Sequence, residues 1–137
     1  MQNKISIIAL EKAFISLSKA MERANLDLSD LELRDACIQR FEYTYELSNK
    51  IIKRFIEEVQ PSPEIVDQLT YRDLLRLAAE VGIVESVEAW FRFREARNKT
   101  SHAYNEINAQ EVFNEIPHFM QHANQLINTI KSKINNL

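Results

Sequence analysis

The sequence predicts an all-α protein, an up-and-down four-helix bundle with one short extra helix. Three observations support this prediction. The chain of 137 residues contains one glycine and three prolines, so few residues favour the tight turns of β-hairpins. Apolar residues recur at spacings of three and four, and no stretch alternates as a β-strand does. The length suits one domain with one hydrophobic core, which we place at residues 1–137.

The first half of the chain predicts two long helices. Over residues 4–25 the apolar positions alternate steps of three and four, as in helix bundles. After a polar turn, Ser29 and Glu32 have the spacing of a capping box, so a second helix should begin near residue 30. This helix runs to about Val59, where Pro61 follows and a connection begins.

A short helix follows this connection. Thr70 and Asp73 have the spacing of an N-cap and its third helical residue, and the helix should continue through Ala79. Gly82 should end it, because glycine adopts the left-handed C-cap conformation freely.

Two more helices complete the prediction, one over residues 84–98 and one running to the C-terminus. Asn108 and Glu111 form the capping signal expected at the start of the last helix. Pro117 lies well inside that helix, so we expect a kink or a new start there.

The helix over residues 84–98 leads into a polar segment, Arg97-Asn98-Lys99-Thr100-Ser101-His102-Ala103-Tyr104. Arg97 continues the aromatic stripe of Trp90 and Phe93, so it needs an anionic partner if that stripe is buried. Five residues of an unbroken helix turn through roughly 500°, which would leave Arg97 and His102 about 140° apart. The two side chains converge only if the helix ends between them. We therefore place Arg97 in the last turn and His102 in the following bend.

Taken alone, these residues allow a purely structural interpretation. Arg97 would cap the helix and pair with a nearby carboxylate, and His102 would satisfy a backbone group in the turn. Asn98 would be a C-terminal capping residue and Tyr104 a half-buried tyrosine at the bend.

The same segment resembles the signature of HEPN domains, in particular of HepT-like toxins and the related nucleotidyltransferase substrate-binding proteins. A second stretch, Gln39-Arg40-Phe41-Glu42-Tyr43-Thr44-Tyr45-Glu46-Leu47, also resembles that branch. The helical layout and the length agree over essentially the whole chain. The resemblance implies a HEPN-type bundle that forms a homodimer with its motif helices facing each other. It also implies a partner, a cognate minimal nucleotidyltransferase.

The function implied by this resemblance is that of a toxin in a two-gene toxin–antitoxin pair, a metal-independent RNA endonuclease. Arg97 and His102 would be the catalytic residues, because a histidine can take the proton of a ribose 2′-OH and an arginine can stabilise phosphate charge. Asn98 would position the phosphate. Tyr104 would be adenylylated by the partner, which would block RNA by bulk and like charge.

Two other functions stay open. The chain could be a non-catalytic subunit that binds nucleotide or substrate for the transferase, or a structural dimeric adaptor. The net charge of −3 and pI of about 5.7 argue against binding nucleic acid by general backbone attraction, so RNA contacts would be local or assisted by a partner. We expect no DNA binding. The chain lacks a glycine-rich phosphate loop, so it is not itself expected to be a nucleotidyltransferase.

Other reactive residues have simpler interpretations. His118 and His122 have the spacing of two metal ligands on one helix, but we favour a solvated or interface pair and assign no metal and no cofactor. Glu42 and Glu46 could bind the partner, counter a buried arginine or face solvent. Cys37, the single cysteine, is interpreted as a small core residue. The apolar run at residues 5–10 is too short for a signal sequence or membrane span, so we expect a cytoplasmic protein.

Overall fold

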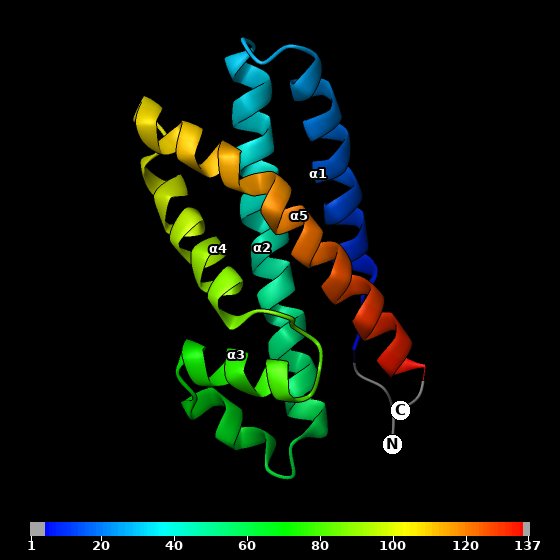
Figure 1. The fold of residues 1–137 in the computed structure, drawn as a ribbon. Helices are drawn as coiled ribbons and strands as arrows, with labels where there is room; N and C mark the ends of the chain where they lie inside the picture. The colour runs from blue at the N-terminus through cyan, green and yellow to red at the C-terminus, as the bar shows by residue number, and fades with distance from the viewer. Residues whose placement is uncertain (1–4, 136–137) are drawn as a thin grey trace.

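The computed structural model describes residues 5–135, and the four-helix bundle predicted from the sequence is confirmed (Figure 1). Its elements are α1 (Ile8–Leu26), α2 (Leu31–Val59), the 3-10 helix η1 (Pro63–Gln68), α3 (Tyr71–Glu80), α4 (Val87–Lys99), the 3-10 helix η2 (Thr100–His102) and α5 (Glu106–Ile134). Neither η1 nor η2 was predicted from the sequence as a separate element.

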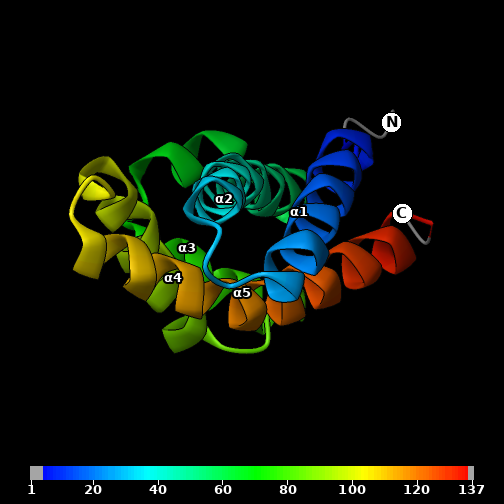
Figure 2. The ribbon, with the colours of Figure 1, turned by 90° about the horizontal axis from the view of Figure 1, so that it is seen from above.

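The long helices α2 and α5 form the centre of the bundle. Each contacts both α1 and α4, so the two outer helices are joined through the central pair. The view from above separates α1 from α4, with α2 and α5 between them (Figure 2). The short helix α3 packs against α2 and α4, near the C-terminal end of α2.

Two of the predicted capping residues are corrected by the structure. Asp30 caps α2 by accepting the Leu33 N–H at 3.1 Å, whereas Ser29 bonds to Asp27 in the preceding turn. α5 begins three residues earlier than the Asn108 signal indicated, because Asn105 is its N-cap. At each of these helix starts a second polar residue, one or three positions away, also fits the role of the cap, and the local sequence pattern does not decide between the two.

The remaining boundary predictions agree with the structure in part. Thr70 caps α3 by accepting the Asp73 N–H at 3.1 Å, and Gly82 follows that helix with a φ of 85°, in the left-handed region that favours glycine. α5 runs through Pro117 as one helix, so the new start considered for that position does not occur. α1 begins at Ile8 rather than at residue 4, which lies outside the described residues, as does the predicted end of the last helix at Leu137.

The aromatic stripe of α4 is buried inside the single chain. Trp90 and Phe93 are both fully buried, and Phe119 of α5 packs against both, with ring centroids 6.0 Å and 5.3 Å away. Phe41 of α2 closes the cluster, 5.0 Å from Phe119. These rings hold α4 on the central pair, and they are therefore not free to form a dimer interface.

Across the described residues, no helix is long and apolar enough to span a membrane.

Candidate functional site

Arg97 lies where the predicted segment places it, in the last turn of α4, and it is held by two carboxylates of α2. Its Nη2 and Nε lie 2.9 Å and 3.2 Å from the same oxygen of Glu46, and its Nη1 lies 3.2 Å from Glu42. The Arg97 side chain is 27% exposed, so it is half-buried rather than solvated. A half-buried guanidinium requires such partners, because an unpaired charge there would be costly.

The sequence left three roles open for Glu42 and Glu46. In the structure both glutamates counter the charge of the half-buried Arg97. They lie four residues apart on α2, which places them on one face of the helix, next to the end of α4. One positive charge faces two negative charges, so the cluster has a net negative charge at neutral pH. A phosphate that approaches Arg97 must compete with both carboxylates.

Thr100 connects the cluster to the bend. Arg97 Nη1 donates to the Thr100 hydroxyl at 3.3 Å. The same hydroxyl lies 2.6 Å from the carbonyl oxygen of Arg97 and 3.3 Å from Glu42, so its one proton serves one of these acceptors at a time. This local bonding ends α4 and starts η2, as expected for a hydroxyl residue at a helix end.

His102 and Tyr104 lie in and just after η2, on the surface. The His102 imidazole is exposed and makes no hydrogen bond with any residue of the 5–135 range; only its backbone carbonyl accepts, from Asn105 and Asn108. The structural interpretation, in which the His102 side chain satisfies a backbone group in the turn, is therefore wrong. Tyr104 is 88% exposed rather than half-buried, and its ring centroid lies 6.1 Å from that of His102. Both side chains are open to a large ligand.

Asn98 lies in the last turn of α4, next to Arg97. Its side chain makes no hydrogen bond within the described part of the chain. The structure brings the His102 and Tyr104 rings together at the bend, whereas no contact among the described residues joins Arg97 to His102, and none fixes the neighbouring Asn98 amide.

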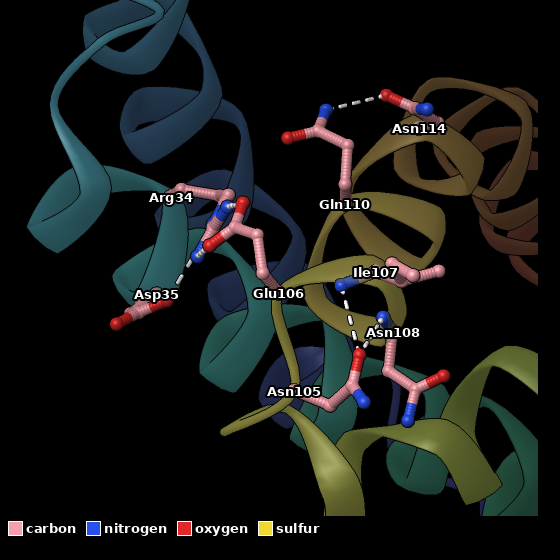
Figure 3. Close-up of polar contacts among 8 residues, drawn as sticks. All are labelled: Arg34, Asp35, Asn105, Glu106, Ile107, Asn108, Gln110 and Asn114. Atoms are coloured by element: carbon pink, nitrogen blue, oxygen red, sulfur yellow. Dashed lines mark hydrogen bonds and ion pairs between the residues drawn. The ribbon is translucent and has the colours of Figure 1, made fainter.

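An ion pair that was not predicted from the sequence fixes the start of α5 beside this bend (Figure 3). Arg34 of α2 is 7% exposed and donates through both terminal nitrogens to the two carboxylate oxygens of Glu106. The hydrogen bonds hold the pKa of Glu106 below its usual range and raise that of Arg34. Because Glu106 follows the N-cap Asn105, the pair ties the turn after Tyr104 to α2.

A signal for this ion pair was present in the sequence. Arg34 lies three and seven residues before the buried Cys37 and Phe41, which places an arginine on an apolar stripe of α2. Such an arginine needs an acidic partner, although its spacing does not say which one.

The histidine pair of α5 lies apart from the polar segment. His118 and His122 have ring centroids 4.8 Å apart and both pack on Phe93, while His118 Nδ1 lies 3.1 Å from Glu115. Burial lowers the pKa of His122, and electrostatic repulsion by the neighbouring His118 lowers it further. No group of three metal-binding side chains occurs among the residues that the structure describes. The half-buried pair packs at the edge of the core. Cys37 is fully buried, and burial raises its pKa.

The fold and the site define a helical-bundle protein that carries an ion-paired arginine at the end of α4 and an exposed histidine in the bend that follows. The chain belongs to the family described as nucleotidyltransferase substrate binding protein like, whose model matches residues 6–132. The resemblance to HepT-like proteins is thereby confirmed. A relative from Haemophilus influenzae named probable ribonuclease HepT is 28% identical, with 97% of each chain covered.

Two solved structures have the same fold. One, also from Haemophilus influenzae, is described as revealing the fold of a substrate binding domain of a nucleotidyltransferase. It superposes with a TM-score of 0.85 at 27% identity, over 92% of this chain and 99% of its own. The other, from Thermus thermophilus, superposes with a TM-score of 0.71 at 30% identity, over 88% of this chain and 97% of its own.

Proposed function

We propose that this protein is the toxin of a two-gene toxin–antitoxin pair and that it cleaves RNA without a metal ion, using Arg97 and His102. The observation that carries the proposal lies at the end of α4 and in the bend after it. The Arg97 guanidinium is held in place in the last helical turn, while the His102 imidazole of the bend is exposed and free of hydrogen bonds to the described residues. The name of the Haemophilus influenzae relative, probable ribonuclease HepT, supports this function.

The proposed reaction is a transfer within the RNA strand. His102 takes the proton of a ribose 2′-OH, whose oxygen then bonds to the adjacent phosphorus. The bond from phosphorus to the 5′-oxygen of the next nucleotide breaks, and that oxygen is protonated by solvent. Arg97 stabilises the charge that builds on the non-bridging phosphate oxygens, and Asn98 helps to orient the phosphate. The products are a 2′,3′-cyclic phosphate and a 5′-OH.

Control of this activity is assigned to a cognate minimal nucleotidyltransferase. Tyr104 is proposed as the acceptor of the adenylyl group, because its side chain is exposed beside His102. Nucleotide phosphates attached there would repel RNA and occupy the approach to His102. The active form is proposed to be a homodimer.

A second function is favoured by a specific observation, the pairing of Arg97 with two carboxylates. A net negative cluster suits a non-catalytic subunit that binds substrate or nucleotide for the transferase, in agreement with the description of the solved Haemophilus influenzae domain. In that case the cluster would need no contact with an RNA phosphate.

Analysis of the cleavage products separates the two functions. Labelled RNA is incubated with purified, unmodified protein, with and without EDTA, and the fragment ends are determined by mass spectrometry. The ribonuclease function predicts 2′,3′-cyclic phosphate and 5′-OH ends in both samples. Cleavage that EDTA abolishes would contradict the metal-independent mechanism, and absence of cleavage on all RNAs would favour the binding subunit.

A further inference from the structure

An open hollow of about 290 Å³ lies beside the Arg97 cluster, between α2 and η2. Its polar wall comes from three residues of α2, Asp35, Gln39 and Glu42. They follow one another at intervals of four and three, so they share one face of the helix. The opposite wall contains Thr100 and Tyr104. This volume lies just below the range of ligand pockets, which begins at about 300 Å³, and is suitable for part of a nucleotide.

The hollow is continuous with the proposed catalytic cluster. Glu42 and Thr100 line it, and both also contact the Arg97 guanidinium, at 3.2 Å and 3.3 Å. A nucleotide whose phosphate meets Arg97 therefore has this hollow next to it. The nearest neighbour of a phosphate along an RNA strand is a ribose with its base, and a base is flat enough to enter an open hollow.

The lining is suited to a base rather than to a second phosphate. The Gln39 amide makes no hydrogen bond with any described residue, and the only ion pair of Asp35 within that range is a long contact of 3.7 Å to Arg34. Two carboxylates repel phosphate but accept hydrogen bonds from N–H groups. The Tyr104 ring, 88% exposed, offers a face on which a base can stack.

We infer that this hollow is a base-recognition site that prefers guanine in the nucleotide next to the cleaved phosphate. Guanine alone presents two adjacent donors on its Watson–Crick edge, N1–H and the exocyclic amino group, which match the two oxygens of the Asp35 carboxylate. Adenine and cytosine place an acceptor beside their amino group, and uracil places its single N–H between two carbonyl oxygens. The Gln39 amide can meet the guanine O6. This inference names the substrate of the proposed ribonuclease and rests on that function.

The test uses the full chain and four RNAs that differ only in the base next to a single cleavage site. We expect the guanine RNA to be cleaved roughly ten- to a hundredfold faster than the uracil RNA, the discrimination typical of a bidentate contact to a base. Asp35→Asn should remove most of this preference, and Gln39→Ala should reduce it. Glu32→Gln is the matched control, because it removes one negative charge from the exposed start of the same helix outside the hollow.

A second measurement keeps the inference testable if no RNA is cleaved. Binding of GMP, AMP, CMP and UMP is then followed by NMR, with the resonances of the Gln39 side-chain amide as the probe. Binding of GMP that is preferred over UMP and weakened by Asp35→Asn would retain the guanine site while the ribonuclease function fails. Cleavage without base preference, a preference unchanged in Asp35→Asn, or equal binding of all four nucleotides would overturn the inference.

Discussion

Arg97 and Glu46, which lie 51 residues apart in the chain, form the shorter of the two ion pairs that hold the Arg97 guanidinium, with Nη2 2.9 Å from Oε2. Glu42 adds a second carboxylate to the same guanidinium. The arginine is therefore fixed before any ligand arrives, and a negative field surrounds it. A phosphate that binds there must displace part of this pairing or be drawn in by other contacts.

The first prediction concerns this negative field. Glu46→Gln removes one charge beside Arg97 and keeps the shape of the side chain. We expect an RNA made uncleavable by 2′-O-methylation to bind about three- to tenfold more tightly, because one like charge at the surface contributes about 1 kcal/mol of repulsion. Fluorescence anisotropy at low salt measures the Kd. Glu64→Gln, on the exposed η1 at the far end of α2, is the control. Equal affinities for wild type and Glu46→Gln would contradict this account of the field.

The second prediction concerns acid stability. Hydrogen bonds from Arg34 hold the pKa of Glu106 below its ordinary value of 4.5. A carboxyl with a depressed folded-state pKa stabilises the fold above its unfolded-state pKa, and that contribution is lost as the pH falls through the folded-state value. We therefore expect Glu106→Gln to lower the free energy of unfolding at neutral pH, and the difference from wild type to shrink below about pH 4.5.

Urea unfolding at neutral pH and in steps down to about pH 3 measures this difference. Glu111→Gln is the matched control, since its ion pair with Lys99 joins two exposed side chains 3.4 Å apart and should contribute little at any pH. A difference between wild type and Glu106→Gln that does not change with pH would show that the ion pair is not its source.

The sequence predicted the helices and the motif segment because both depend on local patterns. Thr70 and Gly82 mark the two ends of α3 through local backbone interactions within a few residues, so their spacing alone was enough to locate them. The pairing of Arg97 with Glu42 and Glu46 depends on how α4 lies against α2, and the sequence offered it only as one of three roles. Burial of the α4 aromatic stripe inside one chain depends on a phenylalanine of another helix, α5. From α4 alone, the same stripe could equally have faced a second copy.

The third prediction concerns modification. We expect intact mass spectrometry of the protein, co-expressed with the proposed cognate nucleotidyltransferase, to show one or more added AMP units that disappear in Tyr104→Phe. Tyr43→Phe is the control, because Tyr43 is also an exposed tyrosine, at 40%, and its hydroxyl bonds to Ser16 away from the bend. Adducts that persist in Tyr104→Phe would move the acceptor to another residue.

The fourth prediction concerns assembly. We expect light scattering at micromolar concentration to give a mass about twice the 16.0 kDa of one chain. Because Trp90 and Phe93 are buried, the expected interface would use other residues, and exposed apolar side chains such as Ile107, 71% exposed, are available near the motif. A mass near that of a single chain would exclude a site shared between two copies.

Cleavage of labelled RNA by His102→Ala and Arg97→Ala proteins tests the central claim most directly. His102→Ala should lose roughly 10²–10⁴-fold in rate as the proton acceptor is removed. Arg97→Ala should lose roughly 10²–10³-fold, by analogy with an oxyanion donor. The double variant should be little worse than the worse single one, because the two groups act as a unit. Neither side chain belongs to the apolar core, so circular dichroism should show wild-type helicity in every variant. Full cleavage by a well-folded His102→Ala protein would contradict the account.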